Sequence, residues 1–347
     1  MTTTWPLPLP TRAARAPLQR VAASAPMRVS FAGGGTDLPR VARRVGGRVV
    51  GTAIDLRTRA VVEPFERGWV RLRSSAGDAL RRSGDPPRSD MAFRLLEAAL
   101  ASAGVTDGVT LRIETDVAPG AGLGGSAAAA VAALFALRLA MEEPAPPDEL
   151  AREASAVERE RLRIACGAQD QVLAAFGGML DLTFDGRGCS GVRPLEVAPG
   201  ERGAALVAAL EAGLLLVDTE VRRVSGEVLD RTPSADDGRA AVELLAAAED
   251  VVRGFAAGSL DQVVAGMRRS AAAKMRRAAA ASATAVALSE KLRGHGVEVI
   301  RMCGAGDGGH VLIWAPSDRH AAILAALDPC VVRRPALNAP GVRREEG

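Results

Sequence analysis

The first half of the chain shows short apolar runs and segments in which apolar and polar positions alternate. Met27–Phe31 is an apolar-rich run, and Gly47–Arg57 and Val109–Glu114 alternate with the period of two that predicts β-strands. Trp69–Arg73 and a stretch with helical spacing near Asp90–Ala103 lie between them. We therefore expect the chain to open with β-structure and to continue with mixed elements.

Helical patterns follow. An Ala-rich apolar stretch at Ala127–Met141 predicts a packed helix, and the sequence EEPAPPD at 142–148 ends it. Asp148 is a suitable N-cap for another helix that runs to about Arg163. Gly167 breaks that pattern, and a further helix begins at 169–171.

The second half also mixes strands and helices. Strands are expected at Gly213–Asp218, Val297–Met302 and Val311–Trp314, with helices through about 239–294. A length of 347 residues, at roughly 150 per domain, predicts two domains. The polar stretch at 185–202, which carries Gly and Pro, is the expected boundary.

Composition and charge exclude several classes of protein. Apolar residues make up 48% of the chain and charged residues 24%, which is typical of a globular protein. A formal net charge of +3 provides no basic face for nucleic acid. The longest uncharged apolar run, Ala127–Leu137, is too short to span a bilayer, so no membrane partner is expected.

The cysteines and histidines favour a reducing compartment and no metal cage made of protein ligands alone. The four cysteines lie far apart without a CxxC motif, which fits free thiols in the cytoplasm. The three histidines form no HExxH motif and have no Cys partner at metal spacing.

Two glycine-rich loops match GxGxxG, one at Gly120–Gly125 and the other at Gly304–Gly309. Neither has the strand and helix context of a dinucleotide site, and the first lacks the lysine of a Walker loop. A glycine loop that leads into a helix can nevertheless bind phosphate through backbone N–H groups and the helix dipole. Ser126, at that junction, is either a magnesium ligand or a helix N-cap, and the loop alone leaves both open.

Three segments together resemble a known superfamily. They are PMRVSFAGGGTDLP at 26–39, PGAGLGGSAA at 119–128 and CGAGDGG at 303–309. In order and spacing they resemble the motifs of the GHMP kinases, the superfamily of galactokinase, homoserine kinase, mevalonate kinase and phosphomevalonate kinase. The form RVSFAGGGTDLP and the sequence at 158–171 are most similar to bacterial D-glycero-D-manno-heptose 7-phosphate kinases. Gly125, in place of a serine, and Asp307, in place of a glycine, depart from the usual pattern.

The resemblance implies specific roles in phosphoryl transfer, which needs positioned phosphates, a metal and a residue that orients or deprotonates the acceptor hydroxyl. Asp170 aligns with the catalytic aspartate, and Arg28 with an arginine beside it. Ser126 and Glu158 align with magnesium ligands, so ATP and Mg²⁺ are the implied cofactors.

Further residues are implied as binding groups. The ATP phosphate loop comprises Pro119, Gly120, Ala121, Gly122, Leu123, Gly124, Gly125, Ser126 and Ala127, and the third glycine loop comprises Gly304, Ala305, Gly306, Asp307, Gly308 and Gly309. The expected substrate residues are Gly34, Gly35, Thr36 and Asp37, with Arg222, Arg223 and Lys274 as cations for a phosphate already on the substrate.

The implied fold is a two-domain α+β kinase. It has an N-terminal ATP-binding domain at 25–190 that is similar to ribosomal protein S5 domain 2, and a ferredoxin-like C-terminal α/β sandwich at 200–335. Residues 1–24 are expected to form a flexible tail, and 336–347 a second tail. Monomer and homodimer are both left open.

The implied reaction phosphorylates the anomeric hydroxyl of a heptose 7-phosphate or related sugar and gives a sugar 1-phosphate. Two alternatives stay open: a kinase of the same superfamily that acts on a hexose, a cyclitol or an amino alcohol, and a nucleotide-binding pseudokinase. The presence of Asp170, Glu158 and Ser126 argues against the pseudokinase.

Overall fold

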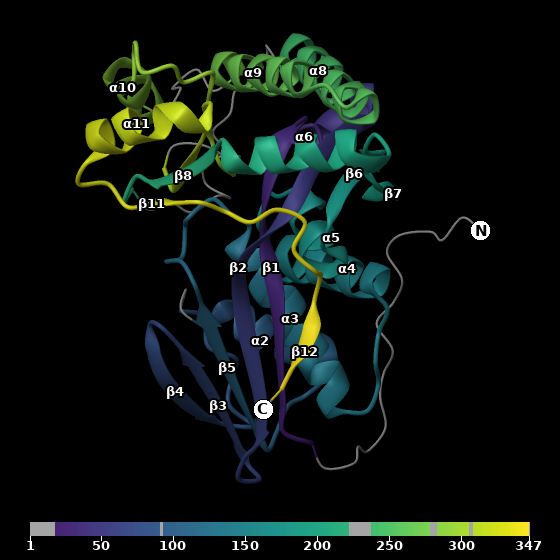
Figure 1. The fold of residues 1–347 in the computed structure, drawn as a ribbon. Coiled ribbons are helices and arrows are strands. Elements are labelled where there is room, and N and C mark those ends of the chain that lie inside the picture. Colours follow the sequence, from purple (N-terminus) through teal and green to yellow (C-terminus); the bar gives the residue numbers. More distant parts are fainter. Residues whose placement is uncertain (1–17, 91–92, 222–236, 278–282, 305–307, 347) are drawn as a thin grey trace.

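The structure is a computed structural model that describes residues 18–90, 93–221, 237–277, 283–304 and 308–346. Within these residues the strands form a larger and a smaller sheet, and helices cover both (Figure 1). The expected α+β class and two-domain architecture are confirmed. None of the helices described has the length and apolar character that a bilayer crossing requires.

The larger sheet contains most of the N-terminal half. Its main path runs β12-β1-β2-β5-β3-β4, and β6 joins it by pairing with β2 and then with β7. The bounds are β1 (Val21–Ala32), β2 (Gly47–Pro64), β3 (Trp69–Ser74), β4 (Gly77–Arg82), β5 (Val109–Thr115), β6 (Met179–Phe184), β7 (Cys189–Pro194) and β12 (Arg343–Glu345).

The long strand β2 holds this sheet together because it pairs with three partners. It is antiparallel to β1 along most of its length, while its first six residues pair with β6 and its last seven with β5. The pairing with β1 changes register between Pro26 and Met27, next to Arg28. Since a bulge bends and twists a strand, it changes the direction in which the following side chains point.

Helices cover one face of the larger sheet, and α3 is the central one. The Ala-rich sequence of α3 has high helix propensity, and its small side chains allow close contact with β1 and β2. The helices of this half are α1 (Pro39–Val45), α2 (Arg94–Ala103), α3 (Gly125–Ala140), α4 (Pro147–Ala156) and α5 (Gln169–Phe176).

The second half forms the smaller, antiparallel sheet, in the order β11-β8-β10-β9, with its helices gathered at one end of the molecule (Figure 1). The strands are β8 (Leu214–Asp218), β9 (Val299–Met302), β10 (His310–Trp314) and β11 (Val332–Arg333). The helices are α6 (Gly200–Ala212), α8 (Asp237–Ala257), α9 (Leu260–Arg277), α10 (Ala283–Lys291) and α11 (His320–Leu327).

Three local expectations differ from the structure. Pro147 occupies the first turn of α4 and Pro146 its N-cap, so Asp148 lies inside the helix instead of capping it. The expected helix to Arg163 ends at Ala156 and continues as a π-helical turn, Val157–Arg161. The polar stretch 185–202, expected as a boundary, contains β7 and the start of α6.

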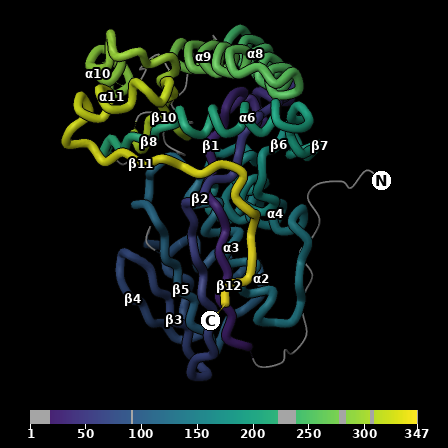
Figure 2. The backbone as a smooth tube through the Cα atoms, in the orientation of Figure 1, coloured from purple at the N-terminus to yellow at the C-terminus, as the bar shows by residue number. Residues whose placement is uncertain are grey.

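Both expected tails differ as well. The described part of the N-terminal one, from Leu18, enters β1 at Val21, and residues 1–17 lie outside the described residues. The C-terminal segment crosses back from the smaller sheet to the larger one, as the yellow trace in Figure 2 shows. There β12 pairs with β1, and Arg57 donates hydrogen bonds to the carbonyl oxygens of Pro340 and Gly341, both at 2.9 Å.

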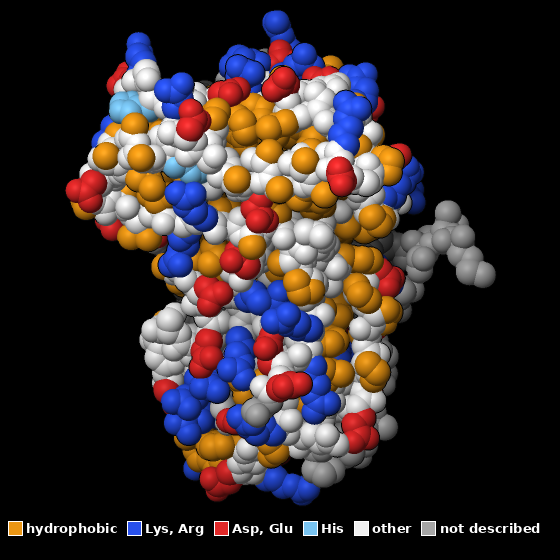
Figure 3. Space-filling model, viewed as in Figure 1, with side chains coloured by type: hydrophobic (Ala, Val, Ile, Leu, Met, Phe, Trp, Pro, Cys, Tyr) orange, Lys and Arg blue, Asp and Glu red, His pale blue; other side chains and the backbone are white. Residues whose placement is uncertain are grey.

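A continuous apolar core joins the two halves. Phe31 of β1 and Phe255 of α8 are fully buried, with ring centroids 5.6 Å apart. Strand β1 therefore packs against α3 on one side and against a helix of the second half on the other. On the surface, Figure 3 shows orange hydrophobic side chains concentrated around the upper helices and charges of both signs interspersed below.

This packing predicts that Phe255→Ala lowers the free energy of unfolding by about 3–5 kcal/mol, because it leaves a cavity where both halves meet. Urea denaturation followed by circular dichroism measures the change. Val242→Ala on the same helix is the matched control, since Val242 is 56% exposed and should change stability by less than about 1 kcal/mol. Equal effects of the two substitutions would contradict a shared core.

Candidate active site

An ion pair between the buried Arg28 and the partly exposed Asp170 lies at the centre of the site. Arg28, on β1, is 5% exposed, and its Nε donates to Asp170 Oδ1 at 2.7 Å while a terminal nitrogen bonds to Oδ2. The other terminal nitrogen donates to the carbonyl oxygen of Gly122 at 2.8 Å. Burial opposes the charge on Arg28, but the Asp170 carboxylate raises the guanidinium pKa above its usual value. Arg28 thus fixes the position of both the start of α5 and the phosphate loop (119–127).

Asp37 lies on one side of this pair. Its Oδ1 accepts hydrogen bonds from the Gly35 N–H at 3.1 Å and from Gln169 Nε2 at 3.0 Å, and its Oδ2 accepts one from the Gln169 N–H at 3.3 Å. A side chain at Gly167 would overlap Asp37 Oδ2, so the close approach of the two loops requires glycine there. Burial, and secondarily the charge of Asp170, raises the pKa of Asp37.

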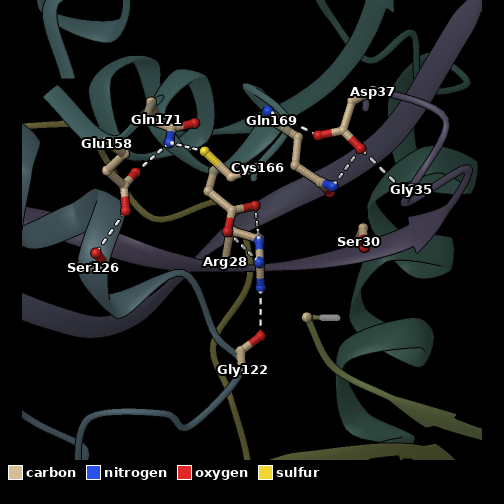
Figure 4. Close-up of polar contacts among 12 residues, drawn as sticks. Arg28, Ser30, Gly35, Asp37, Gly122, Ser126, Glu158, Cys166, Gln169 and Gln171 are labelled. Carbon is tan, nitrogen blue, oxygen red and sulfur yellow. Dashed lines mark hydrogen bonds and ion pairs between the residues drawn. The ribbon is translucent and has the colours of Figure 1, made fainter. Parts of the chain in front are cut away.

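Ser126 and Glu158 are hydrogen-bonded to each other and lie on the opposite side of Arg28 from Asp37 (Figure 4). Ser126 Oγ, in the first turn of α3, donates to Glu158 Oε1 at 2.6 Å, and Gln171 Nε2 donates to Oε2. Burial raises the pKa of Glu158 to about 6, because these two neutral donors only partly replace the lost water. Glu158 lies in the π-helical turn, a distortion that occurs often at functional sites.

The Ser126 and Glu158 oxygens are suited to a magnesium ion. Mg²⁺ prefers oxygen ligands and commonly keeps several waters, so one carboxylate and one hydroxyl beside substrate phosphates are sufficient. A buried carboxylate whose hydrogen-bond donors are both neutral also gains stability from a nearby cation. Among the described residues no cluster of three or more His, Cys, Asp or Glu side chains could hold a metal by itself.

The phosphate loop (119–127) and the third glycine loop (304–309) lie next to each other, and backbone atoms make the contacts. The N–H of His310 donates to the carbonyl oxygen of Ala121 at 2.8 Å. A Cβ atom at Gly304 would lie 2.9 Å from the carbonyl oxygen of Gly122, closer than a side chain permits. The smaller sheet therefore adjoins the phosphate loop at a distance that only glycine allows.

Several of the other expected residues have structural roles or lie outside the described part of the chain. Thr36 is fully buried, and its hydroxyl shares one proton between the carbonyl oxygens of Gly33 at 2.8 Å and Arg48 at 3.0 Å, so it builds the turn. Leu123 and Ala127 are likewise buried, so their side chains belong to the core. The expected residues that lie outside the described residues are Arg222, Arg223, Ala305, Gly306 and Asp307.

Lys274, expected to contact a substrate phosphate, has other partners in the structure. Its Nζ donates to the carbonyl oxygen of Met302 at 3.1 Å and to that of Gly304. These bonds attach α9 to the start of the third glycine loop.

Sequence reasoning missed Gln169, Gln171, Ser30 and Arg301. The two glutamines flank Asp170 in the sequence QDQ. Their position next to a candidate catalytic acid could have marked them as candidate site residues. Arg301 stands three residues before Gly304, yet its contact with Ser30 joins positions 271 residues apart. No local pattern predicts that contact.

Comparison with known proteins finds similar sequences and similar folds. Residues 90–178 match the family model for the N-terminal domain of GHMP kinases. The chain is 26% identical over 219 residues to a D-glycero-alpha-D-manno-heptose 7-phosphate kinase from Campylobacter jejuni. That match covers 61% of this chain and 63% of the relative's length.

Two solved structures show the same fold. A D-glycero-D-manno-heptose 1-phosphate kinase from Bacteroides thetaiotaomicron superposes with a TM-score of 0.75 at 19% identity, over 94% of this chain and 99% of the other. A galactokinase from Lactococcus lactis, complexed with galactose, gives 0.74 at 17% identity, over 94% and 95%. Residues 90–178 are thus similar to a GHMP kinase N-terminal domain, and the chain has the fold of these two kinases.

Proposed function

We propose that the protein is an ATP-dependent sugar kinase that phosphorylates the anomeric hydroxyl of a heptose 7-phosphate or related sugar. The observation that carries the proposal is the contact of Asp170 with Arg28, because Arg28 binds its carboxylate. Arg28 itself lies between the Ser126–Glu158 pair and the Asp37–Gln169 pair (Figure 4). The heptose specificity is supported by the similarity to the Campylobacter jejuni kinase.

In the proposed reaction the acceptor oxygen forms a bond to the γ-phosphorus of ATP, and the bond to the β,γ-bridging oxygen breaks to release ADP. Asp170, whose side chain is 26% exposed, takes or orients the proton of the acceptor hydroxyl. Arg28 keeps this carboxylate in place and adds positive charge beside the transferring group. The glycine loop binds the phosphates through backbone N–H groups.

Ser126 and Glu158 would hold Mg²⁺, which neutralises the charge of the nucleotide phosphates when bound. Asp37, fixed by Gly35 and Gln169, would accept hydrogen bonds from sugar hydroxyls. A cytoplasmic location belongs to the proposal, because the four cysteines are free thiols.

The direct test supplies the purified protein with ATP, magnesium and a panel that contains D-glycero-D-manno-heptose 7-phosphate, hexoses, cyclitols and amino alcohols. ADP release identifies the acceptor, and phosphorus NMR identifies the position of the new phosphate. A product phosphorylated at the anomeric carbon is expected. ATP binding without turnover of any acceptor would instead indicate a pseudokinase.

The first prediction from this proposal concerns Asp170. Asp170→Asn should lower kcat by about 10²- to 10⁴-fold, since the amide can neither accept the acceptor proton nor pair fully with Arg28. ATP affinity, measured by calorimetry, should be retained because Asp170 is assigned to the acceptor. Activity within a few-fold of the wild type would remove Asp170 from the mechanism.

The second prediction concerns the metal. Ser126→Ala and Glu158→Gln should each raise the magnesium concentration at half-maximal rate by about 10- to 100-fold, as groups that hold or orient a metal do. Matched controls are Ser155→Ala, whose hydroxyl bonds only within α4, and Glu160→Gln, whose side chain is exposed. If all four variants share the wild-type magnesium dependence, the metal lies elsewhere.

The third prediction concerns the sugar. Asp37→Ala should lower kcat/KM for the best sugar by about 10- to 150-fold per lost hydrogen bond to the carboxylate, with little change in the KM for ATP. Asp37→Asn, which keeps the shape, should be less damaging. An equal loss of affinity for sugar and ATP would assign Asp37 to the fold alone.

A further inference from the structure

Arg301 in β9 carries a buried positive charge with no carboxylate partner in the described part of the chain. The residue is 4% exposed; one terminal nitrogen donates to the carbonyl oxygen of Ser30, and the other donates to the Ser30 hydroxyl at 2.6 Å. A guanidinium has five N–H donors, so Ser30 engages only part of it. The Nε is buried and has no acceptor among the described residues.

This arrangement differs from that of the other buried arginines. Arg28 is paired with Asp170, and Arg138 with Glu153. Burial of a charge without a counter-ion is strongly unfavourable. Burial lowers the pKa of Arg301 to about 10, which still leaves the guanidinium protonated at neutral pH. Burying the charged Arg301 guanidinium therefore costs desolvation free energy, and no carboxylate among the described residues offsets that cost.

The Arg301 guanidinium lies close to Gly34, Ser30 and Gln169. A methyl group placed at Gly34 would lie 3.0 Å from an Arg301 terminal nitrogen, 3.2 Å from Ser30 Oγ and 3.8 Å from Gln169 Oε1. Gln169 Oε1 is buried and has no donor among the described residues, although Nε2 of the same amide binds Asp37. The Arg301 Nε–H donor and the Gln169 Oε1 acceptor, neither with a partner among the described residues, thus belong to side chains that both lie beside Gly34.

We propose that Arg301 binds an anionic group of the acceptor, a phosphate monoester, while Gln169 Oε1 accepts a hydroxyl of the same molecule. The proposal rests on the proposed function, because it specifies the acceptor as a sugar that already carries a phosphate. ATP is the other source of a phosphate. We favour the acceptor because Ser30, Gln169 and Asp37 lie on one side of Arg28, and Ser126 and Glu158 lie on the other (Figure 4).

The test compares D-glycero-D-manno-heptose 7-phosphate with the same heptose without its phosphate. Arg301→Met should lower kcat/KM for the phosphorylated sugar by about 10- to 150-fold and leave that for the unphosphorylated sugar nearly unchanged. Arg301→Lys should retain part of the preference because it keeps the charge. The control is Arg253→Met, since Arg253 is exposed on α8.

Two outcomes would overturn the proposal. An equal loss for both sugars would make Arg301 a structural residue, and a raised KM for ATP in Arg301→Met would assign its charge to the nucleotide. The unphosphorylated sugar also serves as the check on folding, since a misfolded variant loses both activities.

A second measurement separates this proposal from the proposed function. Wild type and Arg301→Met are titrated with inorganic phosphate in the absence of nucleotide, by calorimetry. Binding by the wild type that Arg301→Met abolishes supports the anion site even if no sugar is turned over. Equal binding by both proteins, or binding by neither, overturns it.

Discussion

The site depends on the ion pair between Arg28 and Asp170, because it connects three segments that are distant in the chain. Arg28 belongs to the central strand β1, Asp170 to the first turn of α5, and Gly122, the second partner of Arg28, to the phosphate loop. Removing one member of a buried ion pair typically costs about 3–5 kcal/mol. Asp170 keeps its outer surface exposed, so the same contact that fixes the carboxylate leaves it accessible to an acceptor.

Around this pair the protein concentrates negative charge. Asp37 and Glu158 are both buried, their hydrogen-bond donors are neutral, and burial together with the Asp170 charge raises the pKa of each. The hydrogen bonds from the protein do not fully balance the negative charge of these carboxylates. It is favourable for cations and hydroxyl donors to enter it, which is consistent with a divalent ion at Ser126 and Glu158 and a polyol at Asp37.

The features that the sequence predicted are those that depend on local order. The strands at Met27–Phe31, Gly47–Arg57 and Val109–Glu114, the Ala-rich helix and the two-domain class are confirmed, because period and propensity act over a few residues. The structure also brings Arg28, Asp37, Ser126, Glu158 and Asp170 together, although their catalytic roles stay predictions. Long-range pairing was missed: nothing near Arg343–Glu345 indicates that it pairs with β1, and nothing near Arg301 indicates Ser30.

The two halves of the molecule meet at the site through two different kinds of contact. At the phosphate loop the halves meet through backbone atoms, where Ala121 and Gly122 adjoin His310 and Gly304. A Cβ atom at Gly304 would lie 2.9 Å from the Gly122 carbonyl oxygen, so glycine is required there, and the His310 side chain adds a contact of its Nδ1 with the Ala121 carbonyl oxygen at 3.1 Å. At the acceptor side the contact is made by side chains, with Arg301 against Ser30. Under the proposals above, the contact at the glycine loops serves the nucleotide and the Arg301–Ser30 contact serves the acceptor, whose negative charge would balance the buried guanidinium.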